Sequence, residues 1–308
     1  MVALDASPHS LAALQAAVDL AAARRLEVLA LFVEDLRLLQ ATALPFAGEV
    51  GAFSGMVRPL DVAQTERRLH DLARRVEALV AASAERAEVP WSFLVRRGDV
   101  TAEILACAGE GDVLSLGAAG WSPMRTRALG ETAGRLLRLA RGPMLLARHG
   151  TRLTPPLLVL LEGARWRDTL ETAIQLAGDA AGALVLAVPP GPAQPAREAE
   201  ARAVLDAQRV GPTRIRLLAG AGPAALRALV RRERAGALLA PMDAGALQGE
   251  AGERLMATFD VPVILVRWND AVTLDATPSP DPARRNHEGG NHASGNQASG
   301  NHEKSPLG

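Results

Sequence analysis

One order of short apolar runs and longer helical patterns occurs twice along this chain, and this repetition constrains the fold most strongly. In the first pass, from residue 2 to residue 147, strand-like runs alternate with segments whose apolar residues recur at helical spacing. The second pass repeats that order from residue 157 to residue 266. Strands that alternate with helices favour a parallel sheet covered on both faces. We therefore expect an α/β protein with two tandem five-stranded parallel open sheets.

Landmark residues indicate that the two passes arose by internal duplication. Pro143 and Pro262 open the last apolar run of each pass, and Gly130 and Gly249 precede the last helical pattern. Polar, proline-containing sequence interrupts the apolar pattern near residues 150–156. The predicted domains are residues 1–150 and 155–268, followed by a low-complexity tail over 271–308.

The tail has a composition of its own. From Asn286 onward the sequence reads NHEGG, NHASG, NQASG and NHEKS, with almost no apolar side chains. Such a segment cannot bury enough surface to offset its conformational entropy, so residues 271–308 are expected to be disordered. His287, His292 and His302 could together hold a transition metal, but a flexible tail is favoured because no carboxylate or thiolate fixes them.

Composition argues against several classes of protein. The 34 basic and 34 acidic residues cancel, so phosphate backbones and anionic lipids exert no general attraction, and nucleic acid is not an expected partner. Apolar runs have the length of strands, which predicts no membrane association. Asp5 and His9 interrupt the start where an export signal would be apolar, so a cytoplasmic location is expected. The single cysteine, Cys107, excludes an intramolecular disulfide.

A glycine motif carries the main functional signal. Gly117, Gly120 and Gly130 are spaced G-x2-G-x9-G, after an apolar run and before a helical stretch that starts at Thr132. Phosphate loops are built this way, because glycines let the backbone approach an oxyanion and the following helix directs free N–H groups at it. The motif therefore predicts an anion cradle in the first domain.

Glu131 opposes that prediction. Its carboxylate stands directly after the last glycine, where it would repel a phosphate. It can instead stabilise the helix start by about 0.3–1 kcal/mol through the helix dipole. The duplicated Glu250 favours this structural role, because it persists in a half where binding is implausible.

The second pass lacks the features of a site. Glu162-Gly163-Ala164 replaces Asp5-Ala6-Ser7, and Pro241 replaces Gly117. The loop from Pro241 to Gly249 is also five residues shorter than its counterpart. We expect this half to act as a built-in dimer partner, whose strand 261–266 pairs with strand 143–147.

Structural roles compete with binding roles at other positions, and catalysis finds no support. Asp5 can end a strand and prepare a helix cap without any ligand, and Ser7 and Ser10 are capping residues first. The first half offers His9, His70 and His149 as bases, in no recognisable triad spacing. No catalytic residue and no metal site are predicted, and we do not expect an enzyme.

Together these motifs resemble the universal stress protein family. The resemblance covers nearly all of residues 1–148 and, more weakly, 155–268. It rests on four segments that follow the predicted strands: Asp5-x-Ser7-x-x-Ser10, Phe32-Val33-Glu34, Gly98-Asp99-Val100 with Ile104-Leu105, and Gly117-x2-Gly120-x9-Gly130.

The resemblance implies a Rossmann-like fold of the adenine nucleotide α-hydrolase kind, which dimerises through its last strand, so a homodimer is an option. In ATP-binding members the nucleotide lies at the carboxyl ends of the strands. Asp5 would then sit near the ribose hydroxyls, the Val33 backbone near the adenine edge, and the three glycines around the phosphates. Such members usually have Ser or Thr at the two positions that here hold Glu131 and Thr132.

Three hypotheses follow. The first is a stress or signalling protein that binds ATP, or a related adenine nucleotide, in its first domain. The second is a nucleotide-free interaction module with the same fold. The third, an enzyme of the wider adenine nucleotide α-hydrolase group, is least favoured because adenylylating signatures are missing; slow ATP hydrolysis stays open for the family.

Overall fold

The computed structural model describes residues 1–42, 44, 48–50, 57–59, 61–109, 111–120, 129–178, 182–220 and 222–267. All of them belong to one compact unit, Met1–Asp275. The predicted tail over 271–308 lies outside the described residues, as do Arg125 and Arg127 in the glycine loop.

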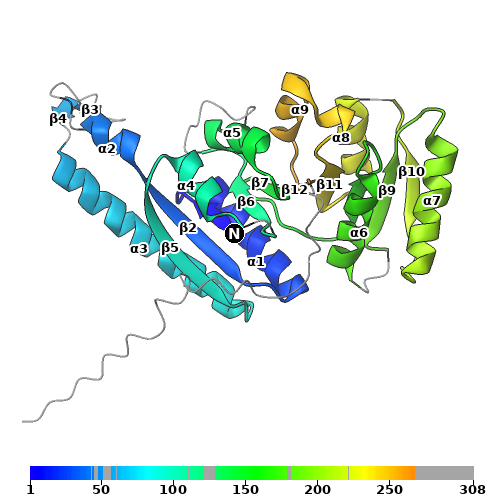
Figure 1. Ribbon diagram of the computed structural model, residues 1–308, viewed down its shortest axis with the longest axis horizontal. Helices are drawn as coiled ribbons and strands as arrows, with labels where there is room; N and C mark the ends of the chain where they lie inside the picture. Colours follow the sequence, from blue (N-terminus) through cyan, green and yellow to red (C-terminus); the bar gives the residue numbers. More distant parts are fainter. Residues whose placement is uncertain are drawn as a thin grey trace, which may run out of the picture. The chain divides into compact units, whose positions relative to one another are not determined.

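A ten-stranded sheet runs through the described part of the chain in the order β5-β2-β1-β6-β7-β12-β11-β8-β9-β10 (Figure 1). The strands of the first half are β1 (Val2–Leu4), β2 (Val28–Asp35), β5 (Trp91–Gly98), β6 (Leu114–Gly117) and β7 (Met144–Ala147). Those of the second half are β8 (Leu157–Leu160), β9 (Leu184–Val188), β10 (Arg214–Leu217), β11 (Ala237–Pro241) and β12 (Val263–Val266). Strands within each half are parallel. The predicted α/β fold with two five-stranded parallel sets is confirmed.

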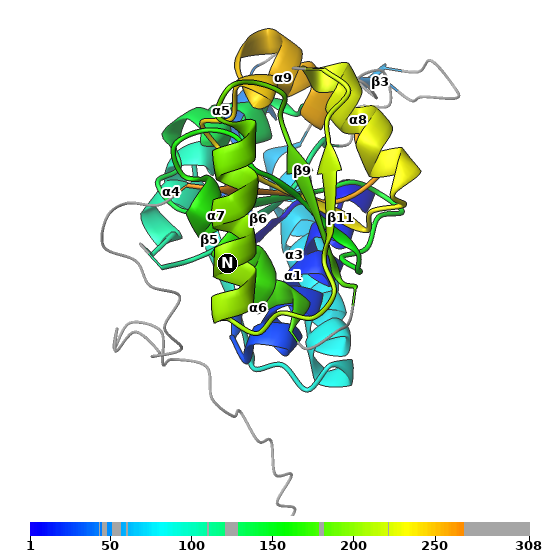
Figure 2. The same cartoon turned by 90° about the vertical axis from the view of Figure 1, so that its right-hand side faces the viewer.

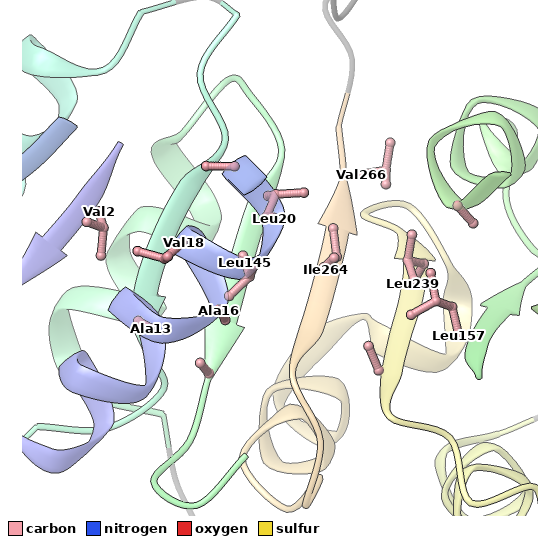
Figure 3. Packing of buried hydrophobic residues seen from close by; sticks show 14 of the residues in the cluster. Val2, Ala13, Ala16, Val18, Leu20, Leu145, Leu157, Leu239, Ile264 and Val266 are labelled. Atoms are coloured by element: carbon pink, nitrogen blue, oxygen red, sulfur yellow. The ribbon is translucent and has the colours of Figure 1, made fainter. Parts of the chain in front are cut away.

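The two sets join through one antiparallel pair. In β7 and β12, Leu145 lies opposite Ile264 and Met144 lies opposite Leu265. Figure 3 shows side chains of both strands on the same face of the sheet, with Leu239 and Leu157 of the neighbouring strands beyond them. The halves therefore share one continuous sheet, which includes the two strand ranges that were expected to pair.

Helices cover both faces of this sheet (Figure 1, Figure 2). One face carries α1 (Pro8–Arg24), α3 (Val62–Arg86), α6 (Trp166–Ala177) and α7 (Gln194–Ala207). The other carries α4 (Val100–Cys107), α5 (Glu131–Leu139), α8 (Pro223–Arg232) and α9 (Gly249–Met256). Among the described residues, no helix combines the length and apolarity needed to cross a bilayer.

Each face has its own hydrophobic core, and both cores run through both halves. Side chains along a strand alternate between faces, so Leu145 of β7 packs in the α1 and α6 core while Leu146 packs in the α5 and α9 core. Buried area is thus organised by faces of the sheet and continues across the seam between β7 and β12.

The segment after β2 contains regular structure. It includes α2 (Leu36–Thr42) and an antiparallel pair, β3 (Gly48–Val50) and β4 (Val57–Pro59). The α2 helix starts directly at the strand end because Asp35 Oδ1 accepts a hydrogen bond from the Arg37 N–H, at 2.8 Å. That local cap was not recognised in the sequence.

Candidate functional site

The carboxyl ends of β1 and β6 bring Asp5 and the glycine loop together. These strands are neighbours, with Val2 opposite Ser115. Asp5 follows β1 directly, and a Cβ built on Gly120 would lie 3.8 Å from Asp5 Oδ2. Two of the predicted site positions therefore meet at one edge of the sheet.

Asp5 is held by the turn that leads into α1. Its Oδ1 accepts from the Ser7 N–H at 2.9 Å, and Ala6 between them has a positive φ of 62°. The Ser7 hydroxyl caps α1 by accepting from the Ser10 N–H at 3.1 Å, and the Ser10 hydroxyl donates to the Ser7 carbonyl at 3.1 Å. Both serines are buried while Asp5 is exposed. The serines thus serve as caps, and the carboxylate faces the loop.

The structure explains the three glycines in different ways. At Gly117 a Cβ would lie 2.8 Å from the Ser10 backbone nitrogen, so this glycine is required by the packing of β6 against α1. At Gly130 the nearest atoms to a Cβ are Ala119 Cα and Gly120 N at 3.5 Å, which is ordinary contact. Among the described residues, a Cβ on Gly120 would meet only Asp5. Packing within this part of the chain therefore requires Gly117 but neither Gly120 nor Gly130.

The start of α5 lies against the start of the glycine loop. The Gly130 N–H donates to the Ala118 carbonyl at 2.9 Å. Gly130 is also the N-cap of α5 and offers no side chain to the N–H groups of the first turn. Glu131 is exposed at the first helical position, and Thr132 is half-buried behind it. The positive end of the α5 dipole is thus placed beside Gly120 and Asp5.

Val33 lies on the next strand at the same level as Asp5. Leu4 pairs with Phe32 in parallel register, so Asp5 and Val33 are the residues that follow on β1 and β2. After Val33 comes Glu34, whose buried carboxylate accepts from Arg97 Nε of β5 at 2.9 Å. This ion pair fixes the end of β2 and with it the Val33 backbone.

His9, for which the sequence predicted no catalytic role, lies at this edge of the sheet. His9 Nδ1 accepts from the His149 N–H at 3.1 Å, just after the end of β7. Burial, together with the positive charges of Arg148 and His149, lowers the pKa of His9, and Asp5 acts in the opposite direction. The sequence did contain a signal for this position of His9, because Arg148 and His149 directly follow the last strand of the first half.

The second half has the same backbone hydrogen bonds at its strand ends but different side chains. The Ala118 N–H donates to the Ala147 carbonyl, and the Met242 N–H donates to the Val266 carbonyl, at 2.8 and 3.0 Å. This match makes Asp243 the counterpart of Ala119. Likewise Gly163 has a φ of 79° where Ala6 has 62°.

In that second half the carboxylates bind their own backbone. Asp243 Oδ2 accepts from the Ala164 N–H at 2.7 Å, in the turn after β8. Glu162 Oε2 accepts from the Ala246 N–H at 3.3 Å. Ala246 belongs to a short 3-10 helix, η1 (Gly245–Leu247), which replaces the long glycine loop. Carboxylates of the second half thus hydrogen-bond backbone N–H groups at its own strand ends.

Known proteins share this fold. The model of the universal stress protein family matches residues 1–148. A universal stress protein from Archaeoglobus fulgidus DSM 4304 has a similar structure, with a TM-score of 0.66, 18% identity, and coverage of 87% of this chain and 97% of that chain. A putative universal stress protein from Pseudomonas aeruginosa UCBPP-PA14 is also similar, with a TM-score of 0.52, 16% identity, and coverage of 86% and 91%.

No curated protein matches the chain. At these identities the solved structures establish the fold. Over residues 1–148, the chain matches the universal stress protein family.

Proposed function

We propose that residues 1–148 bind ATP or a related adenine nucleotide in the cytoplasm, and that the chain acts in a stress response through the occupancy of this site. One observation carries the proposal. The Asp5 carboxylate, the side-chain-free Gly120 and the N-terminus of α5 converge at the carboxyl ends of β1 and β6. Open α/β sheets bind ligands at this edge.

The residues at this edge fit the parts of a nucleotide. Asp5 would accept hydrogen bonds from ribose hydroxyls, and the Val33 backbone would border the adenine. Gly120, Gly130 and the first-turn N–H groups of α5 would receive the phosphates. Gly120 and Gly130 fit this role because packing against the described residues would admit a larger residue at either position, so packing does not explain the glycines. Thr132 adds a half-buried hydroxyl nearby. A bound nucleotide would add charge and bulk at this edge of the sheet and so change the surface of the protein. We propose that it binds without turnover.

A nucleotide-free interaction module is the second candidate, and a specific observation favours it. Gly117 is explained by its contact with α1, and Ser7 and Ser10 by capping. These members of the motif would persist in a chain that binds nothing.

Equilibrium dialysis with ATP separates the two candidates. Asp5→Asn keeps an oxygen that accepts from the Ser7 N–H but removes the charge, so we expect about tenfold weaker binding. Glu162→Gln, at the matched position of the second half, should leave ATP affinity unchanged. Absence of binding at millimolar ATP would exclude the first candidate.

Glu131 gives a second test with the opposite sign. Its exposed carboxylate stands at the first position of α5, so Glu131→Ser should tighten ATP binding about two- to fivefold by removing a repulsion on the scale of helix-end charge effects. An unchanged affinity would mean that the side chain points away from the phosphates.

A further inference from the structure

A cavity of about 680 Å³ lies at the seam between the two halves, away from the proposed nucleotide site. Its walls come from the end of β12, the turns after β8 and β11, and helices α5 and α9, which Figure 1 shows on either side of the seam. Cavities of several hundred Å³ are of the size that takes small organic ligands. Neither the family match nor the proposed function uses this space.

Apolar side chains line much of the cavity. They are Leu137 of α5 and, from the second half, Met242, Leu247, Met256 and Leu265. The two methionines are unbranched and polarizable, so they adapt to ligands of irregular shape. These walls favour a ligand with an apolar body.

The charged groups around the cavity favour one negative charge on that ligand. Among the described residues, three arginines and two carboxylates line it: Arg138, Arg165, Arg267, Asp243 and Glu253. Arg138 pairs with Glu253 at 3.2 Å and Arg165 pairs with Asp168 at 3.4 Å, while Asp243 accepts from the Ala164 N–H at 2.7 Å. Arg267 is therefore the lining arginine that is open to an anionic group.

Backbone carbonyls, and no carboxylate of the described residues, hold Arg267. Its guanidinium donates to the Ala140 carbonyl at 2.8 Å and to the Leu137 carbonyl at 3.4 Å. Carbonyls hold the side chain in place but leave its positive charge uncompensated, and among the described residues no carboxylate forms an ion pair with it. A half-buried, oriented guanidinium is well suited to a carboxylate, sulfonate or phosphate group.

We propose that this seam cavity binds a small amphipathic monoanion. The apolar body lies between Leu137, Met242 and Met256, and the anionic group lies at Arg267. Because both halves contribute walls, the bound ligand ties α5 to α9. This site is independent of the nucleotide site at Asp5.

Two fluorescent probes that share one aromatic body test the proposal. 8-Anilinonaphthalene-1-sulfonate carries a sulfonate, and N-phenyl-1-naphthylamine does not. Titration of the full chain should give saturable 1:1 binding of the sulfonate, at least about tenfold tighter than binding of the uncharged probe, because a charge-assisted contact contributes at this scale.

Two variants locate the probe. Arg267→Gln keeps an amide that can donate to the helix carbonyls but loses the charge, so sulfonate affinity should fall about tenfold while the uncharged probe is unaffected. Ala164→Phe fills the cavity from an exposed wall position and should weaken both probes. Arg202→Gln, which removes an exposed arginine of α7, is the matched control and should change neither.

Equal affinity of the two probes would overturn the proposal. So would sulfonate binding that survives both Arg267→Gln and Ala164→Phe, or no saturable binding at all. Circular dichroism melting curves that coincide with that of the unmodified chain establish that each variant is folded. Asp5→Asn should leave probe binding intact, which separates this result from the outcome of the ATP experiment.

Discussion

The two halves have the same arrangement of strand ends, but different side chains follow those ends. In the first half, the carboxylate after β1 is exposed beside Gly120 and the uncapped start of α5. In the second half, Glu162 and Asp243 are hydrogen-bonded to backbone N–H groups of the neighbouring turns. A duplicated frame can therefore keep its fold while its loops diverge, because the N–H after the first strand is bound by Asp5 in one half and by Asp243, from a different loop, in the other.

The largest expected effect concerns the shortened loop. In α9, a Cβ on Gly252 would overlap the backbone of Leu247 in η1, whereas the counterpart in α5 is Ala133. Gly252→Ala should lower the free energy of unfolding by about 2 kcal/mol, because overpacking of about 3 kcal/mol outweighs about 1 kcal/mol of helix propensity. Urea unfolding monitored by circular dichroism measures the change.

Ala133→Gly is the matched variant in the first half. It removes a buried methyl group and adds helix flexibility, so a loss of about 1 kcal/mol is expected. If Gly252→Ala were neutral, the 3-10 helix would not be pressing on α9, and the contrast between the two loops would fail.

A carboxylate introduced into the first half should convert it to the state of the second. Ala119 is the counterpart of Asp243, so in Ala119→Asp the new side chain would compete for the Ser7 N–H and repel phosphates. ATP affinity should fall more than about tenfold, as measured by equilibrium dialysis. Ala119→Asn has nearly the same shape without the charge; equal losses in the two variants would assign the effect to shape.

Acid should act on the first half through His9, whose counterpart in α6 is the buried Trp166. Burial lowers the pKa of His9 below its ordinary value of 6.5, so the folded state favours the neutral ring. This contribution is present above the unfolded pKa and is lost as pH falls through the folded pKa, because the unfolded chain takes up the proton first.

The variant His9→Asn keeps an acceptor for the His149 N–H and removes the titration. Its free energy of unfolding should therefore fall less than that of the unmodified chain between about pH 7 and about pH 5, the range in which histidine titrates. Asp5, Arg148 and His149 surround position 9 in both proteins, so the difference between the two profiles reports on His9. Parallel pH profiles would contradict this role of His9.

The smallest effect is expected for the ion pair that joins the two halves across the seam. Arg138 of α5 and Glu253 of α9 are 3.2 Å apart, and their side chains are 62% and 41% exposed. Arg138→Gln should cost no more than about 0.5 kcal/mol, and less in high salt. Unfolding midpoints measured at low and high salt check both statements. A larger loss of stability would mean that this ion pair contributes more than an exposed pair ordinarily does.

Much of the fold was predictable because buried parallel strands contain few polar residues. The full length of β5 is harder to predict, because Arg96 and Arg97 are exposed on the outermost strand. The polar helix α7 is hard to predict for a related reason. Only Ala201 and Leu205 of its residues are buried, too few for a clear helical period.

The candidate site divides in the same way. That Asp5 and the glycine loop meet follows from the ends of neighbouring parallel strands, and this was predictable. The contacts of Asp243 with Ala164 and of Glu162 with Ala246 were not, because they depend on the path of the shortened loop. The seam cavity depends on how two distant segments pack, which periodicity does not encode.

The antiparallel pair β7 and β12 has a consequence for how this protein can change over time. In a symmetric homodimer, one gene specifies both partners, so each substitution appears twice and a residue that fills one site fills the other. Here the two partners occupy separate stretches of one chain. Either half can acquire a substitution while the other keeps its original residue, and a sensor with one working site and one inert scaffold becomes accessible by single steps.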